Sequence, residues 1–178
     1  MAGIYVHIPF CSQACYYCDF HFSTSLKTKT KIIQSIKNEL LSEKKYLKGE
    51  LVNTIYFGGG TPSFLDVDSI QSILKTIQKN FKLSNNIECT IEANPEDITE
   101  IKVKKWYSIG VNRISLGVQS FRDKDLEYMN RSHSKDQAIK SIELIKKSKI
   151  SSISVDLIYG FPLLDNFAWK QNLETVIS

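Results

Sequence analysis

Five apolar segments of strand length recur along the 178 residues, and they are separated by segments whose apolar residues have helical spacing. This alternation predicts an α/β fold in which parallel strands are joined by right-handed crossovers. No low-complexity stretch or linker interrupts the pattern, so we expect one domain. The predicted strands are residues 3–8, 51–57, 87–93, 112–118 and 151–159.

The intervening segments repeat apolar residues every three or four positions, which is the spacing of one helical face. The first carries an isoleucine- and leucine-rich stripe between residues 32 and 41, and the second carries one between residues 70 and 81. Asp66 or Asp68 is expected to cap the second helix. Further helices are predicted at residues 100–108, 123–129 and 135–147, and a last one begins near Phe167.

Within the strands, apolar and polar residues alternate, whereas strands buried on both faces of a parallel sheet read as continuous apolar runs. In the first strand, for example, Ile4, Val6 and Ile8 alternate with Tyr5 and His7. We expect the apolar face to meet the helices and the polar face to line a wet or ligand-filled cavity.

Sites in parallel barrels lie at the carboxyl ends of the strands. The residues that the sequence places there are a cysteine-containing loop, the glycine run 58–61, Glu92, Gln119 and Asp156.

The length limits the architecture, because a complete eight-stranded barrel needs about 250 residues. The last helical pattern stops at Ser178. We therefore expect an open sheet or a partial TIM-type parallel barrel that is truncated after about five β/α units, with residues 1–178 forming the N-terminal part of the domain.

Composition narrows the class of protein. A hydrophobic content of 42% and a charged content of 24% are ordinary for a globular domain. The net charge of +4 comes from dispersed lysines, and no basic patch interleaves with aromatics, so we expect no nucleic-acid partner.

No apolar run reaches the length of a membrane span, and the N-terminus lacks a basic lead before Pro9. A cytoplasmic location follows as the default.

Three cysteines, Cys11, Cys15 and Cys18, occupy one short loop after the first strand. In a reducing compartment such clusters indicate metal binding or catalysis more often than disulfides. Three thiolates on one metal centre leave a coordination position open for a small molecule, whereas iron–sulfur clusters usually take four cysteines. The alternatives are a redox pair formed by Cys15 and Cys18 and a structural zinc site that adds His21.

Two further motifs lie at the expected cavity. The run Gly58-Gly59-Gly60-Thr61-Pro62 could form an anion-binding nest of backbone N–H groups, or it could be a plain tight turn. Glu92 could accept hydrogen bonds from ribose hydroxyls or an ammonium group, or it could pair with Arg113 or Arg131. His133 is expected at the surface or in a loop.

Taken together, these segments resemble the radical S-adenosylmethionine (SAM) superfamily. The C-x₃-C-x₂-C loop after YVHIPF and the run GGGTP resemble its signature and glycine motifs. The runs EANPE, GVNRISLGVQSF and DLIYGFP resemble one branch, which comprises the oxygen-independent coproporphyrinogen III oxidases and the radical-SAM heme chaperones. The match extends in order from Gly3 to about Pro162.

The resemblance implies a 4Fe–4S cluster with Cys11, Cys15 and Cys18 on three irons and SAM on the fourth. An electron delivered to the cluster would split SAM into methionine and a 5′-deoxyadenosyl radical. No residue of the chain itself is assigned as catalytic. The positions that match contacts to this SAM are Tyr5, Gly59 and Glu92. Those that match contacts to a second SAM in the oxidase are Tyr17, Gly60, Thr61, Gln119, Arg131 and Asp156.

Two departures from the oxidase point to the heme-chaperone branch: Phe20 stands where the oxidase carries another cysteine, and the first strand begins already at Gly3. The resemblance then implies that heme is bound and passed to an acceptor protein, with an electron donor as a further partner. The alternative is a coproporphyrinogen oxidase of porphyrin biosynthesis, and a structural zinc module is the remote one. The rest of the barrel, a C-terminal domain and the heme-binding segment would lie beyond Ser178.

Overall fold

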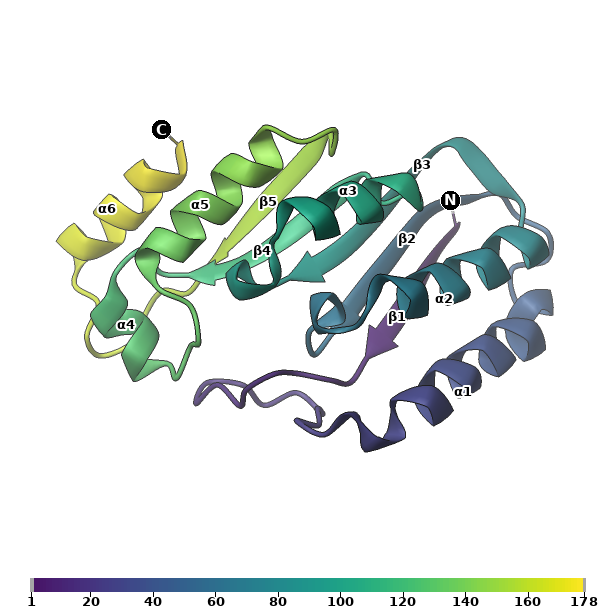
Figure 1. The fold of residues 1–178 in the computed structure, drawn as a ribbon, viewed down its shortest axis with the longest axis horizontal. Helices are drawn as coiled ribbons and strands as arrows, with labels where there is room; N and C mark the ends of the chain where they lie inside the picture. The colour runs from purple at the N-terminus through teal and green to yellow at the C-terminus, as the bar shows by residue number, and fades with distance from the viewer. Residues whose placement is uncertain (1, 178) are drawn as a thin grey trace.

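A computed structural model describes residues 2–177. One five-stranded sheet runs through them, in which neighbouring strands are parallel and follow each other in chain order (Figure 1). The strands are β1 (Ala2–Ile8), β2 (Val52–Gly59), β3 (Leu83–Ala93), β4 (Arg113–Gln119) and β5 (Ser152–Leu157). The sheet is open and, with its crossover helices, forms five units of a partial β/α barrel, as the strand pattern predicts.

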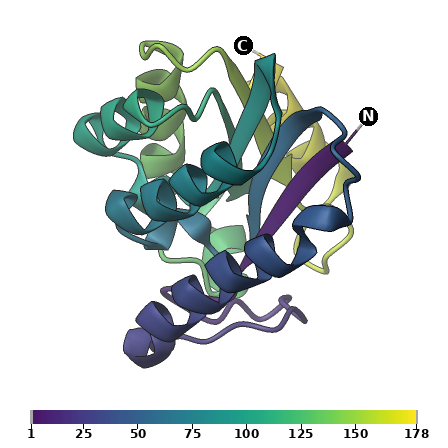
Figure 2. The same ribbon diagram turned by 90° about the vertical axis from the view of Figure 1, so that its right-hand side faces the viewer.

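The helices are α1 (Lys29–Ser42), α2 (Val67–Asn80), α3 (Glu100–Ser108), α4 (Asp123–Tyr128), α5 (Lys135–Lys146) and α6 (Asn166–Ile177). Short 3₁₀ turns cover Leu26–Thr28, Glu43–Lys45, Pro62–Phe64 and Pro95–Asp97. The turned view shows α1, α2, α3 and α5 on one face of the sheet (Figure 2). A sheet whose consecutive strands are neighbours places its right-handed crossovers on one face, so the other face is left for a site.

The alternation in the strands separates these two faces. Ile55, Phe57, Ile91 and Leu116 are all buried against the helices. On the other face, Tyr5 of β1 is 58% exposed. The prediction of an apolar helix-facing side and a polar open side is therefore confirmed.

All five strands differ from the sequence prediction by at least one residue, and β2, β3 and β5 differ most. β2 continues through Gly58 and Gly59, because they pair with His7 and Ile8 of β1. β3 begins at Leu83, which pairs with Val52, and the three residues that follow are polar, so no continuous apolar pattern marks this start. β5 ends at Leu157, two residues before the predicted end.

Of the two capping candidates for α2, Asp66 occupies the N-cap position and accepts a hydrogen bond from Ser69 N at 2.8 Å. Its carboxylate also binds Lys29 of α1 at 2.6 Å, so one side chain ties two neighbouring helices together. Burial works to raise the pKa of Asp66, but the hydrogen bonds from Lys29 and Ser69 hold it at about 2.

No helix within residues 2–177 combines the length and the apolar character that crossing a membrane requires.

We predict that Asp66→Ala lowers the free energy of unfolding by about 1 kcal/mol at neutral pH, because the cap and the contact to Lys29 are lost together. Since the pKa of Asp66 is depressed in the folded chain, its contribution is present above the ordinary aspartate pKa and is lost as the pH falls toward 2. Urea unfolding at neutral and acidic pH measures both effects. Asp68→Ala, in the same helical turn, is the control; an equal loss in both variants would contradict the assignment.

Candidate functional site

A cavity of about 210 Å³ lies at the carboxyl ends of the strands. As the strand pattern predicts, it is lined by residues of β2, β3, β4 and β5, by the loops that follow β1, β2 and β3, and by Arg131 from the segment after α4. The predicted site residues that line it are Cys11, Cys15, Tyr17, Cys18, Gly59, Gly60, Thr61, Glu92, Gln119, Arg131 and Asp156.

The cysteine loop leaves β1 and is closed at its base by backbone contacts. Ser23 N donates to Pro9 O at 2.9 Å, and Cys11 N donates to Ser23 O at 3.1 Å. Phe10, 1% exposed, anchors this base in the core. Cys18 N donates to Cys15 O at 3.1 Å, so a turn brings these two cysteines together.

The same loop is fastened to the segment after α4. Asn130 donates from its side chain to Ala14 O at 2.7 Å, and Gln13 donates to Asn130 Oδ1 at 2.7 Å. Tyr16 N adds a bond to Met129 O at 3.2 Å. Asn130 has a φ of 56°, a left-handed conformation that asparagine tolerates better than most residues. The cysteines are thus held from two sides.

All three cysteines are free thiols. Thr61 Oγ1 lies 3.4 Å from Cys11 Sγ, and Arg131 Nη1 lies 3.5 Å from Cys15 Sγ. Burial, followed by the neighbouring cysteines, raises the pKa of Cys11 even though the Thr61 hydroxyl opposes the shift. Coordination to a metal would hold this thiol as the thiolate against that shift.

The donor set fits an iron–sulfur cluster. Among residues 2–177, no three His, Cys, Asp or Glu side chains converge on a single ion. A cluster does not require that, because each cysteine binds a different iron. Three soft sulfur ligands on one cavity wall are the donors that such clusters take.

The glycine run brings β2 close to the cysteine loop. A Cβ on Gly60 would lie 2.8 Å from Phe10 O and 3.0 Å from Cys11 Sγ, so only glycine fits between them. The anion-nest hypothesis is wrong, because the N–H groups are already used. Gly59 N donates to Glu92 Oε2, Gly60 N to Ile8 O and Thr61 N to Phe10 O.

Glu92 reaches into the cavity from β3, held by Tyr56 and Gly59. Tyr56 OH donates to Glu92 Oε1 at 2.8 Å, and Gly59 N donates to Oε2 at 3.1 Å. The alternative pairing with Arg113 or Arg131 is wrong: Arg113 contacts Glu88 and Thr90, and Arg131 contacts Asn94. Burial, and secondarily the charge of Asp156, raise the pKa of Glu92 despite these hydrogen bonds.

Arg131 crosses the cavity wall and connects four segments. Its Nη2 donates to Asn94 Oδ1 at 2.8 Å and to Gly117 O at 2.9 Å, and its Nη1 contacts Tyr17 OH at 3.3 Å. Burial raises the pKa of Tyr17 to about 12, so its hydroxyl stays protonated at neutral pH. Within residues 2–177, the buried Nε of Arg131 has no hydrogen-bond partner.

The far wall comes from β4 and β5. Ser115 donates to Asp156 Oδ2 at 3.2 Å. Gln119 has a φ of 69°, and the register between β4 and β5 shifts beside it. The left-handed φ of Gln119 changes the direction of the backbone at the end of β4, beside the cavity.

Tyr5 is the one predicted site residue that does not line the cavity. Its ring stacks on Tyr56 with centroids 5.9 Å apart, and its hydroxyl lies 3.3 Å from His7 Nδ1. Through Tyr56 it adjoins Glu92, and its role in holding SAM stays a prediction.

The cavity is also lined by Gln13, Ala93, Asn94, Ser115 and Gly117, to which the sequence assigned no ligand. Ser115 and Gly117 lie on the polar face of β4 that was expected to line a cavity, and Asn94 had a signal, because it directly follows Glu92-Ala93 at the end of β3.

His133 was expected at the surface or in a loop. It lies in the loop between α4 and α5, but it is 3% exposed, so the surface alternative is wrong.

The family model of the radical SAM superfamily matches residues 5–169, and the chain belongs to that superfamily. Among curated relatives, it is 41% identical over 158 residues to "Heme chaperone HemW" of Lactococcus lactis subsp. lactis (strain IL1403), covering 89% of this chain and 41% of the relative. It is 36% identical over 163 residues to "Heme chaperone HemW" of Escherichia coli (strain K12), covering 90% and 43% respectively.

Among solved structures, coproporphyrinogen III oxidase (HemN) from Escherichia coli, described as a radical SAM enzyme, is similar with a TM-score of 0.88 and 27% identity. That match covers 98% of this chain and 41% of the other. The chain thus spans about two fifths of the length of the relatives that it matches.

We predict that Gly60→Ala lowers the iron bound per chain after anaerobic reconstitution of the intact protein, because the added Cβ would displace Phe10 and Cys11. Iron and sulfide analysis measures this. Gly110→Ala is the control: Gly110 has a φ of +104° and no atom within 4 Å of an added Cβ, so its strain costs stability without touching the cavity. Full iron loading of the Gly60 variant would contradict the close-approach argument.

Proposed function

We propose that this chain is the cluster- and SAM-binding part of a heme chaperone. The observation that carries the proposal is the common cavity, which is lined by the three cysteines together with Glu92 and Arg131. Membership of the radical SAM superfamily and the names of the HemW relatives support it.

In the proposed site, Cys11, Cys15 and Cys18 bind three irons of a 4Fe–4S cluster, and SAM binds the fourth. When bound and reduced, that cluster supplies the electron that cleaves SAM. The chain's own residues would bind SAM and orient it. Glu92 can accept hydrogen bonds from an ammonium group or from ribose hydroxyls.

The remaining walls offer complementary groups. Arg131 presents a guanidinium, which pairs well with a carboxylate such as that of SAM. Asp156 adds a second acceptor on the opposite wall, and Gln119 and Thr61 add neutral polar groups. Gly59 and Gly60 keep this part of the cavity free of side chains, and Tyr5 and Tyr17 supply rings at its margins.

Phe20 favours the chaperone over the oxidase. It lines the cavity with a side chain that is 72% exposed, at the position where the oxidase carries an additional cysteine. Heme would be held by the intact protein and passed to an acceptor protein in the cytoplasm, with an electron donor as a further partner. The structural likeness to HemN is the observation that favours coproporphyrinogen oxidation as the second candidate.

Two measurements on the intact protein separate these candidates. Titration of the intact protein with heme is expected to show stoichiometric binding. A protein that binds no heme would overturn the chaperone assignment. An anaerobic assay of the reduced protein with coproporphyrinogen III is expected to yield no decarboxylated product. Formation of that product would establish the oxidase instead.

We predict that Cys15→Ala abolishes cluster assembly and leaves the helical content unchanged, because the loop lies outside the packed strands. Iron and sulfide analysis together with circular dichroism measures both. Cys89→Ala is the matched control: Cys89 is buried in β3 and burial raises its pKa to about 12, so it remains a thiol. Full cluster loading of the Cys15 variant would refute the ligand set.

A further inference from the structure

The segment that carries Arg131 has no regular secondary structure. α4 ends at Tyr128 and α5 begins at Lys135, so Arg131 lies in the loop between them. A long side chain on such a loop loses conformational freedom when it is held at one position. Its neighbours must therefore hold the loop if the guanidinium is to stay at the cavity.

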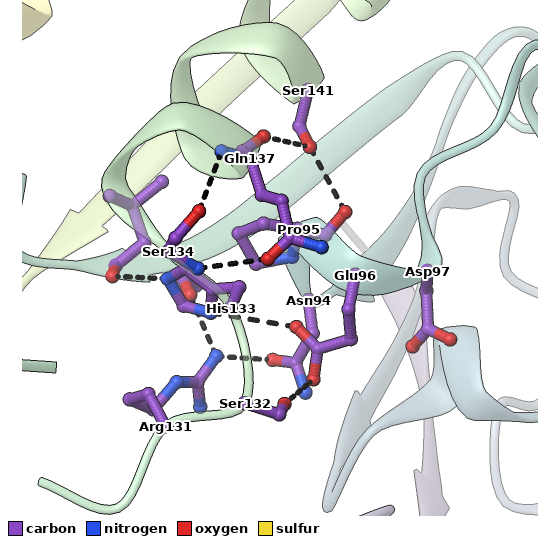
Figure 3. Close-up of polar contacts among 12 residues, drawn as sticks. Asn94, Pro95, Glu96, Asp97, Arg131, Ser132, His133, Ser134, Gln137 and Ser141 are labelled. Carbon is purple, nitrogen blue, oxygen red and sulfur yellow. Dashed lines mark hydrogen bonds and ion pairs between the residues drawn. The ribbon is translucent and has the colours of Figure 1, made fainter. Parts of the chain in front are cut away.

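The turn after β3 supplies the holding contacts, because Glu96 binds the two residues that follow Arg131. Ser132 Oγ donates to Glu96 Oε1, and His133 Nδ1 lies 3.5 Å from Glu96 Oε2 (Figure 3). Asn94, from the same turn, binds Arg131 itself at 2.8 Å. Three contacts thus join residues 94–96 to residues 131–133.

Both ring nitrogens of His133 face oxygen atoms. Nε2 lies 3.0 Å from Val118 O, and Nδ1 lies 3.5 Å from the Glu96 carboxylate. The side chain of His133 is 0% exposed and that of Glu96 is 19% exposed, so water has little access to their contact. Burial works to raise the pKa of Glu96, but the hydrogen bonds from His133 and Ser132 and the charge of Arg131 hold it at about 2.

The turn that carries Glu96 is itself fixed. Ser141 of α5 donates to Pro95 O at 3.0 Å, and Ser134 caps α5 in a reciprocal pair with Gln137. Both sides of the Glu96–His133 contact are therefore anchored to the same helix (Figure 3).

We propose that the contacts of Glu96 with Ser132 and His133 position Arg131 for SAM. Glu96 and His133 are positioning residues: they act through the loop and lie outside the cavity lining. The inference rests on the proposed function only for the identity of the ligand that Arg131 meets.

The test uses Glu96→Gln and His133→Gln in the intact protein, since each replaces one partner of the Glu96–His133 contact. Asp97→Asn is the matched control. Asp97 follows Glu96 in the same turn and its side chain is 16% exposed against 19% for Glu96, but it binds Ser63 and Lys102. Asparagine keeps an oxygen for the Ser63 hydroxyl.

The first readout is hydrogen–deuterium exchange of residues 129–134 in the metal-free protein. It is expected to be faster in both glutamine variants and unchanged in Asp97→Asn. The second is SAM affinity of the reconstituted protein, expected to be at least about tenfold weaker in the glutamine variants at unchanged iron content, which corresponds to about 1.4 kcal/mol.

The positioning role would be overturned if residues 129–134 exchanged at the wild-type rate in the glutamine variants. It would also be overturned if Asp97→Asn showed the same faster exchange and weaker SAM affinity. If one glutamine variant fails to fold, the other carries the test. A wild-type protein that binds no SAM would defeat the proposed function, and the exchange comparison would still decide whether the pair holds the loop.

Discussion

The site depends on contact between two segments that are more than a hundred residues apart. The cysteine loop after β1 and the segment after α4 are joined by the Gln13–Asn130 and Asn130–Ala14 hydrogen bonds, with Arg131 reaching Cys15 beside them. Without this contact the loop would be tied only at its base, near Ser23. Its cysteines would then have no fixed position relative to the strand ends. The contact therefore links the fold of the sheet to the positions of the three cysteines.

The two faces of the sheet differ in character, which leaves one of them free for the site. Its apolar residues pack against the crossover helices, so the polar residues of the same strands are left to line the other side. Consecutive parallel strands bring their carboxyl ends to one edge, where Glu92, Gln119 and Asp156 meet around one cavity. The negative groups lie on the strand ends and Arg131 lies on the loop side, which gives the cavity the two signs of charge that a zwitterionic ligand requires.

Much of this could be predicted from the sequence, because strand alternation and strand ends are local properties. The positions of the strands, the open polar face and eleven of the twelve predicted site residues at one cavity follow from that pattern and from the family resemblance. What could not be predicted depends on tertiary contact. The N–H groups of residues 59–61 look free in sequence, yet their partners are Glu92 and the end of β1. His133 lies in a loop, yet it is buried because Glu96 and Val118 lie on either side. The start of β3 is set by the pairing of Leu83 with Val52, and the polar residues after Leu83 hide it in the sequence.

We propose that Cys11, Cys15 and Cys18 hold a 4Fe–4S cluster whose fourth iron is open to SAM. Electron paramagnetic resonance of the reduced, reconstituted intact protein, recorded with and without SAM, tests this proposal. We expect a 4Fe–4S signal that changes when SAM is added, because SAM binds an iron of the cluster. A spectrum that SAM leaves unchanged, or a protein that takes up zinc and no iron under the same anaerobic conditions, would contradict it.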